Sequence, residues 1–176
     1  MNYLLQGFIL GLGYVAPIGM QNLYVINAAM KEEKEMAYMV AFVTIFFDIS
    51  LALSCFFGVG ALINKSQILK AIMMLLGSVV IIYIGINIIR SSPDISGNVK
   101  IESSFLKVVR NCFAVTWLNP QAIVDGSILL GGYNASIPDE YEKFFIIGIC
   151  LASFLWFTLL STIISLFNKK LDTNII

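Results

Sequence analysis

Five long runs of apolar residues constrain the fold of this chain more than any other feature. They cover residues 3–30, 36–63, 68–89, 112–133 and 144–167. About 20 apolar residues in a helix are enough to cross the hydrocarbon core of a bilayer. A helix also satisfies its own backbone hydrogen bonds, which lipid requires. The sequence therefore predicts an all-α fold, a polytopic membrane helix bundle with about five hydrophobic segments.

The composition favours the same class. Of the 176 residues, 59% are hydrophobic and 12% are charged, with a mean hydropathy of +0.87. An ordinary soluble domain is about 45–50% apolar and about 25% charged. The net charge is zero and the longest basic run is Lys169-Lys170. Nucleic acid is thus not an expected partner, because phosphate binding needs clustered Lys and Arg.

The sequence lacks the residues on which most metal sites and general bases depend. It contains no His, and its three Cys form no CxxC pair. His is the commonest metal ligand and the commonest general base. Cys55, Cys112 and Cys150 all lie in apolar stretches, where free Cys behaves as a small hydrophobe. We expect no enzyme, no cofactor and no metal site.

The chain is expected to form a single transmembrane domain over residues 1–176. Residues 1–90 hold the first three runs, and residues 112–176 hold the last two. Between them, residues 91–111 form a polar linker rich in turn-forming Ser, Pro, Asp, Gly and Asn. Its last part, residues 105–111, places apolar side chains at helical spacing beside Lys107 and Arg110. This pattern predicts a helix lying along the membrane interface before the next span.

Charge distribution predicts the orientation. The first run has no preceding Lys or Arg and is too long for a cleaved signal, so we expect it to span. If all five runs span, eight of the eleven cations fall on one side. These eight are Lys31, Lys34, Arg90, Lys100, Lys107, Arg110, Lys169 and Lys170. The positive-inside rule then places the linker in the cytoplasm and the N-terminus outside.

Two acidic residues interrupt the apolar runs near their middles. Asp48 lies in the second run and Asp125 in the fourth. A carboxylate at that depth costs a few kcal/mol and usually faces a polar cavity or a partner. No intramembrane Lys or Arg is available to pair with either acid. Each Asp either bonds structurally to a neighbouring helix, Ser or Asn, or binds a proton or a cationic substrate.

Proline motifs accompany the acids. Pro17 opens the sequence Pro-Ile-Gly-Met-Gln-Asn, which contains Gly19, Gln21 and Asn22, and Pro120 follows Asn119 in Trp-Leu-Asn-Pro. Proline removes a helical hydrogen bond, so each helix should kink or break there. Backbone groups freed at membrane depth are tolerated only where they line a cavity or are buried in protein. Two such breaks with polar neighbours predict a substrate pathway.

The two motifs form a weak internal repeat. Aligning Pro17 with Pro120 sets Asn22 on Asp125. Repeats of three spans return with inverted topology, as in many secondary transporters, with the binding site at the midplane. The sequence thus predicts two inverted three-helix repeats, of which the last helix is missing because the chain stops at Ile176. A separate small-residue face, from Gly7 to Gly11, favours internal helix packing over a dimer seam.

At these motifs the sequence resembles the lysine exporter (LysE-type) family, and most of all its arginine/lysine branch. The resembling residues are Gln6, Gly7, Pro17, Gly19, Gln21, Asn22, Asp48, Thr116, Trp117, Leu118, Asn119, Pro120, Asp125, Ser153, Phe154, Leu155 and Trp156. The resemblance implies a multi-pass protein of the bacterial inner membrane that exports basic or other amino acids. It implies six hydrophobic segments in two inverted repeats and dependence on the proton gradient.

The resemblance also implies roles for individual residues. Asp48 and Asp125 would be the essential acidic pair, with Asn22 and Asn119 near the pathway. The chain departs from the family pattern at Met20, where Pro is usual, and in the absent sixth segment. A truncated product, or a bundle completed by forming a homo-oligomer, would account for that absence.

The working hypothesis is a proton-coupled secondary exporter of an amino acid, with arginine or lysine favoured. Its partners would be the lipid bilayer, the amino-acid substrate and protons. The alternatives are an exporter of neutral amino acids or metal ions on the same scaffold, and a truncated or structural membrane protein. An intramembrane enzyme has little support, since the sequence has no His and no paired Ser and Lys.

Overall fold

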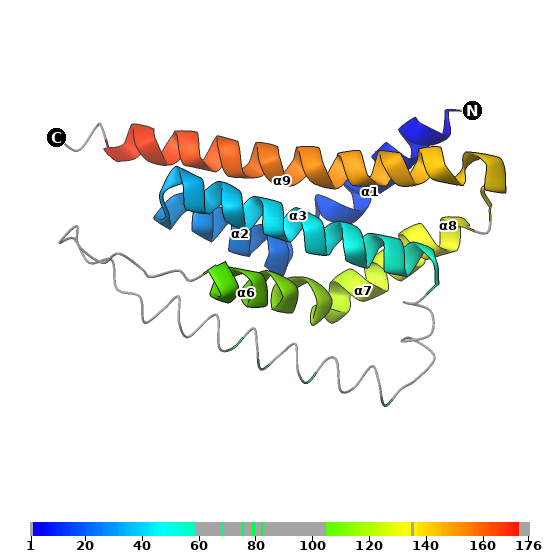
Figure 1. The fold of residues 1–176 in the computed structure, drawn as a ribbon, viewed down its shortest axis with the longest axis horizontal. Coiled ribbons are helices and arrows are strands. Elements are labelled where there is room, and N and C mark those ends of the chain that lie inside the picture. Colours follow the sequence, from blue (N-terminus) through cyan, green and yellow to red (C-terminus); the bar gives the residue numbers. More distant parts are fainter. Residues whose placement is uncertain are drawn as a thin grey trace.

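The described part of the chain is built of helices. The computed structural model describes residues 2–58, 105–134 and 136–172, the last five of these by backbone only, and the single positions Ile68, Leu75, Val79 and Ile82. Its helices run roughly along the long axis of the molecule (Figure 1). Within those residues there is no β-strand. The predicted all-α membrane helix bundle is confirmed.

The first hydrophobic run is a broken helix. Helix α1 (Tyr3–Val15) and helix α2 (Met20–Lys31) meet at an angle of 77°. Together they are long and apolar enough to cross a membrane as one broken span, or to form a re-entrant loop. Pro17 lies between them, so the break occurs where its missing N–H predicts it.

The second and fifth runs are unbroken. Helix α3 (Lys34–Phe56) follows a short turn after α2, and helix α9 (Glu142–Asp172) closes the described chain. Each is long and apolar enough to span a membrane. Gly58, just beyond α3, has φ +85°, a left-handed conformation that glycine adopts at helix C-termini without strain.

The fourth run differs from the expectation of one span starting at residue 112. Helix α6 (Phe105–Trp117) begins in the predicted interfacial segment and continues into the run. It ends before Asn119, where helix α7 (Pro120–Gly126) begins. A π-helical turn (Ser127–Gly131), helix α8 (Gly132–Asn134) and a 3₁₀ turn (Asp139–Tyr141) follow. The third run and residues 91–104 lie outside the described residues, apart from the four single positions.

Helices α1 and α9 touch backbone to backbone. A Cβ at Gly7 would lie 2.1 Å from the carbonyl oxygen of Phe145, and one at Gly11 would lie 2.8 Å from the Ala152 Cβ. On α9, Gly148 makes the reciprocal approach, 2.2 Å from the Leu4 carbonyl oxygen. Small residues allow this proximity, which drives helix association in membranes. The small-residue face therefore packs within the chain, as its spacing favours.

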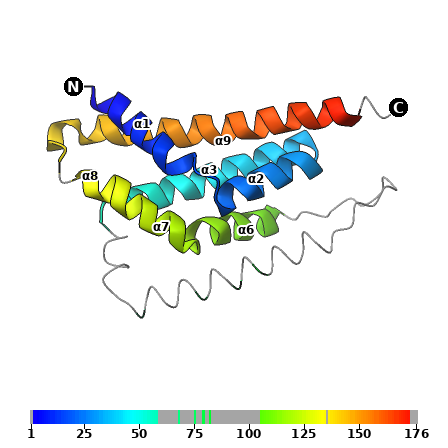
Figure 2. The same ribbon diagram turned by 180° about the vertical axis from the view of Figure 1, so that it is seen from behind.

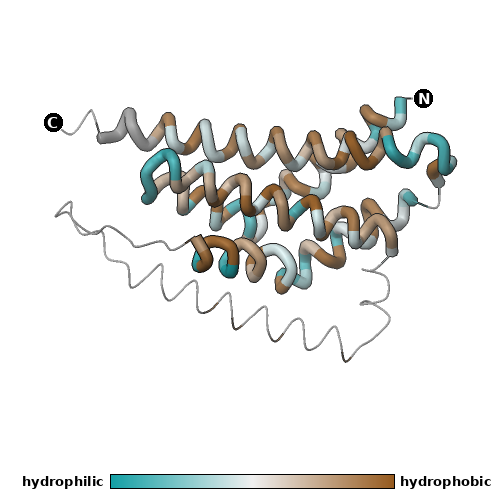
Figure 3. The backbone as a smooth tube through the Cα atoms, in the orientation of Figure 1, coloured by the Kyte–Doolittle hydropathy of each residue, from teal (hydrophilic) through white to brown (hydrophobic). Residues whose placement is uncertain are grey.

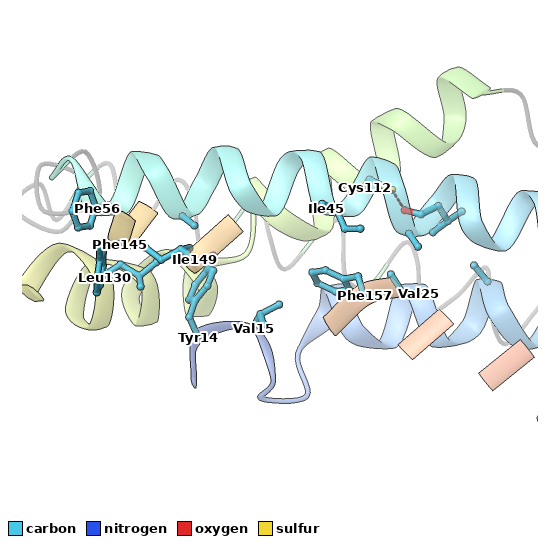
Figure 4. Close-up of a cluster of buried hydrophobic side chains, with 14 of the residues drawn as sticks. Tyr14, Val15, Val25, Ile45, Phe56, Cys112, Leu130, Phe145, Ile149 and Phe157 are labelled. Atoms are coloured by element: carbon cyan, nitrogen blue, oxygen red, sulfur yellow. Dashed lines mark hydrogen bonds between the residues drawn. The ribbon is translucent and has the colours of Figure 1, made fainter. Parts of the chain in front are cut away.

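The core fills the space between α9 and the other helices. Figure 4 shows its two ends, one around Phe56, Phe145 and Leu130, the other around Val25 and Phe157. Phe145 stacks on Phe56 and on Tyr133, with ring centroids 5.6 and 5.3 Å apart. These contacts join α3, the end of the fourth run and α9 at one end of the bundle.

The outer surfaces of the helices are apolar. Large hydrophobic side chains are exposed along α3 and α9, among them Phe46, Leu159 and Phe167. In Figure 3 hydrophobic residues recur along each helix, whereas the hydrophilic colour gathers at the α2–α3 turn and before α9. Such a surface suits lipid, which needs no apolar residue hidden. The protein is a multi-pass membrane protein.

The two broken helices run in opposite directions. The chain passes through α1 and α2 from the end marked N towards the end marked C, and through α6, α7 and α8 in reverse (Figures 1 and 2). Helices α3 and α9 are likewise opposed. Inverted repeats require such opposition. The division into two three-helix repeats stays a prediction, since most of residues 59–104 lie outside the described part.

Candidate functional site

The two helix breaks lie against the same part of α3. From the first break, Gln21 Nε2 donates a hydrogen bond to Asp48 Oδ1 at 3.2 Å. From the second, Trp117 Nε1 donates to Ser50 Oγ at 3.0 Å. Just beyond that break, Ile123 packs in one cluster with Leu51 of α3. Residues 48–51, in the second half of α3, therefore join the two broken helices.

Asn22 holds the first break in shape. Its Nδ2 donates to the carbonyl oxygens of Val15 and Pro17, at 3.0 and 2.7 Å. Helix ends leave carbonyls without intrahelical partners, and this amide supplies the partner for two of them. Its Oδ1 accepts from Trp156 Nε1 at 2.9 Å, which ties the break to α9. Since both N–H groups and the oxygen are engaged, Asn22 acts here as a structural clamp.

Asp48 is a completely buried carboxylate with one free oxygen. Its side chain is 0% exposed, and Oδ1 accepts from Gln21. Oδ2 has no hydrogen-bond partner among the described residues. No Lys or Arg pairs with the carboxylate in that part of the chain. A buried charge without a cation or a full set of hydrogen bonds is costly.

Asn119 and Pro120 shape the second break. Asn119 is the N-cap of α7, and its side chain accepts a hydrogen bond from the Gln121 backbone N–H at 3.2 Å. Pro120 occupies the first helical position, where its missing N–H costs nothing. The first break lacks such a cap, because its N-cap residue is Gly19. The N–H groups in the first turn of α2 therefore face no capping side chain.

Asp125 lies one helical turn beyond the second break. It is half-buried, and both of its oxygens accept from Gln121 Nε2, at 2.8 and 3.0 Å. No hydrogen bond joins Asp125 to Asp48, whose partner among the described residues is Gln21. Both acids thus have the same kind of partner, a glutamine amide.

Comparison with known proteins decides the family. The family model described as "LysE type translocator" matches residues 12–175, nearly the whole chain. This chain belongs to the LysE type translocator family. Its curated relatives include the proteins named "Arginine exporter protein ArgO" of Salmonella enteritidis PT4, Salmonella typhimurium and Salmonella paratyphi A. Each is 28% identical over 98% of this chain and 83% of the relative. No solved structure matches the chain.

Within this translocator, the sequence predictions singled out residues at the two helix breaks but missed several of their contacts. Gln121 was not predicted as a site residue, although a Gln and an Asp four residues apart lie on the same face of a helix. Trp156 was named only as a residue of the family resemblance, yet it donates a hydrogen bond to Asn22. No sequence pattern predicted the π-helical turn after Asp125. Such turns often mark functional sites, and Gly131 within it contacts the Cys55 carbonyl.

The described residues contain no group of three or more His, Cys, Asp or Glu that could hold a metal ion.

Proposed function

We propose that this protein exports a basic amino acid, arginine first, from the cytoplasm across a bacterial inner membrane. The observation that carries the proposal is the pair of carboxylates beside two helix breaks, each bonded to a glutamine amide and to no described cation. The names of the Salmonella relatives support arginine as the substrate. On this proposal the protein is a secondary transporter and carries out no covalent chemistry.

The free oxygen of Asp48 is the group that binds the substrate cation or the proton. A guanidinium or ammonium group donates charge-assisted hydrogen bonds to a carboxylate, and these are about twice as strong as neutral ones. A proton satisfies the same oxygen by neutralising it. Because proton and cation exclude each other at one carboxylate, occupancy by one favours release of the other. Asp125 offers a second carboxylate of the same kind towards the second break.

The uncapped first turn of α2 is suited to bind the α-carboxylate of the substrate. Backbone N–H groups at a helix N-terminus attract anions, helped by the helix dipole. At Gly19 a Cβ would come no closer than 3.9 Å to any neighbour, so this position is open. The substrate's α-carboxylate would bind here, one residue from Gln21 and within reach of Asp48. On α7 the Asn119 side chain already caps the backbone N–H of Gln121. The two helix breaks therefore differ in whether a first-turn N–H is open to an anion.

An efflux assay tests the proposal. Vesicles containing the parent protein, loaded with labelled arginine and given a proton gradient, should release arginine faster than vesicles without it. Asp48→Asn and Asp125→Asn should each reduce that rate to background. Asp139→Asn, in the exposed turn before α9, is the matched control and should leave it unchanged. Parent-level efflux in either interior variant would contradict the roles of the two acids.

The same vesicles separate the alternatives. Homoserine represents a neutral amino acid, and cadmium represents a metal ion. Efflux of either in place of arginine would show that the scaffold serves another substrate. Transport of none of the three by a correctly inserted protein would favour a structural role.

A further inference from the structure

Four hydroxyl groups of α9 are enclosed in the bundle without hydrogen-bond partners among the described residues. They belong to Ser153, Thr158, Ser161 and Ser165. Ser or Thr inside a helix often donates to the carbonyl four residues earlier, as Thr162 donates to the Thr158 oxygen at 2.7 Å. A buried hydroxyl that makes no bond costs about 1–3 kcal/mol. Four such groups on one helix require a partner of another kind.

These hydroxyls lie in the seam between α9, α2 and α3. Two bonds set the register: Trp156 donates to Asn22 of α2, and Thr162 bonds Tyr38 of α3 at 3.0 Å. The buried residues of α2 and α3 include four alanines, Ala28, Ala29, Ala37 and Ala41, whose methyl groups cannot satisfy a hydroxyl. The polar side chains of Asn22 and Tyr38 bond Trp156 and Thr162, not these four hydroxyls.

One end of the row reaches Asp48. Ser153 and Asp48 are both completely buried, and the Ser153 hydroxyl is a neighbouring group that interacts with the Asp48 carboxylate. The geometry of this contact is poor, since neither Ser153 Oγ nor Asp48 Oδ2 makes a regular hydrogen bond to a described residue. Among the described residues, Tyr14, Cys55 and Cys150 also interact electrostatically with Asp48. Asp48 Oδ2 and the Ser153 hydroxyl, which both lack a hydrogen-bond partner among the described residues, thus lie at the same end of the row.

The other end of the row lies near the C-terminal end of α9, where Ser165 is found. That end of α9 is on the side where α2 turns into α3 (Figure 1). The turn carries Lys31 and Lys34 together with Glu32, Glu33 and Glu35. By the positive-inside rule this is the expected cytoplasmic end. The row therefore leads from the candidate site towards the expected cytoplasmic side.

In a more open arrangement of the bundle, water would supply the partner that these hydroxyls lack. A buried water typically makes about three hydrogen bonds to buried polar groups that otherwise lack partners. A chain of waters and hydroxyls also moves protons, because each oxygen accepts one proton and passes on another. We propose that the hydroxyl row of α9, defined by Ser153, Thr158, Ser161 and Ser165, is a hydrated proton route between Asp48 and the end of the bundle that carries Lys31 and Lys34. The inference rests on the proposed proton-coupled function.

Phe157 closes the route in this conformation. Residues 153, 157, 161 and 165 follow one another at four-residue intervals, so they share one strip of the helix. Phe157 is completely buried, and it lies between Ser153 and Ser161 in that strip. Its ring belongs to the same cluster as Val15, Val25 and Ile45 (Figure 4). A closed barrier prevents protons from leaking when no substrate moves.

Cysteine labelling tests hydration without requiring transport. Ser161→Cys and Ser165→Cys should react with a small water-soluble thiol reagent about tenfold faster than Ile163→Cys, since a thiol in a dry site stays protonated and unreactive. Ile163 is 47% exposed on the lipid side of the same helix. Buried Cys112 is an internal dry control, and peptide mass identifies each labelled site. The proposal of a hydrated route would be wrong if Ser161→Cys and Ser165→Cys were labelled as slowly as Ile163→Cys.

The barrier has its own labelling test. Ser153→Cys should react slowly with Phe157 in place and faster once Phe157→Ala is added. Phe157→Leu keeps much of the apolar volume and should leave the reaction slow. Equal rates at Ser153→Cys in all three backgrounds would show that Phe157 closes nothing.

Flux measurements link the row to transport. With Ser161→Ala and Ser165→Ala combined, arginine-driven proton movement in vesicles should fall about tenfold, because the route loses its hydrogen-bonding groups. Arginine–arginine exchange, which moves no net proton, should keep the parent rate. Ser161→Thr, which retains a hydroxyl, should behave as the parent. Equal losses in arginine exchange and in proton movement would show that the hydroxyl row contributes only to helix packing. If the parent carries no arginine at all, the proposed function fails, and the labelling pattern still decides hydration.

Discussion

The Gln21 side-chain amide lies 3.2 Å from Oδ1 of Asp48, and this bond joins a helix break to the centre of another helix 27 residues later. Both side chains are buried, with Gln21 8% exposed and Asp48 0%. Gln21 is in the first turn of α2, so any movement of the break moves the donor relative to the acid. On the proposed function, the occupancy of Asp48 by a proton or a cation and the shape of the first break are therefore linked.

Gln21→Ala should lower both stability and arginine efflux. Removing the amide leaves a second buried oxygen of Asp48 unpaired, at a cost of about 1–3 kcal/mol. Thermal unfolding in detergent and the vesicle efflux assay measure the two effects. Gln121→Ala is the matched control, since its bond to Asp125 is exposed and water can replace it. A larger stability loss for Gln121→Ala than for Gln21→Ala would contradict this ranking.

Asn22→Leu should destabilise the first break. The change removes the bonds to Val15, Pro17 and Trp156, together worth about 1–3 kcal/mol in a membrane protein. The unfolding midpoint in detergent should fall accordingly. Asn27→Leu is the control: Asn27 is half-buried on the same helix and has no hydrogen bond to a described residue. A midpoint that falls equally in both variants would mean that the clamp contributes nothing specific.

Gly7→Ala should disrupt the packing of α1 on α9. Its Cβ would lie 2.1 Å from the Phe145 carbonyl oxygen, and backbone cannot move away as a side-chain tip can. Overpacking of this kind costs about 1–3 kcal/mol or more. Expression and the monodisperse fraction after solubilisation report the result. Gly13→Ala, two turns along α1, has nothing within 4 Å and should be neutral or slightly stabilising. Normal yield for Gly7→Ala would show that α1 and α9 are less tightly joined.

Gly131→Ala should impair the π-helical turn. A methyl group there would lie 2.7 Å from the Cys55 carbonyl oxygen, which forces α3 and the turn apart. We expect a lower unfolding midpoint and, since the turn follows Asp125, slower arginine efflux. The neighbouring Gly132→Ala meets nothing within 4 Å and should do neither. Indistinguishable behaviour of the two adjacent variants would remove the turn from the mechanism.

The sequence alone was sufficient for properties that depend on single residues or short segments. Apolar run length indicated the helix bundle, and proline chemistry placed the first break at Pro17 and the second at Pro120, where α1 and α6 end. The family followed from motifs within those same segments. These predictions succeeded because helix length and helix termination are set by neighbouring residues in the chain.

Tertiary structure decided which polar atoms meet. Asn22 was predicted to lie near the pathway, yet its amide bonds the break and Trp156, 134 residues away. Asp48 and Asp125 look equivalent in sequence, but one is completely buried and the other half-buried. The hydroxyls of α9 gain significance only because the packed bundle leaves them without partners among the described residues. Such contacts depend on the packing of distant helices, and no local pattern specifies which side chain will stand opposite.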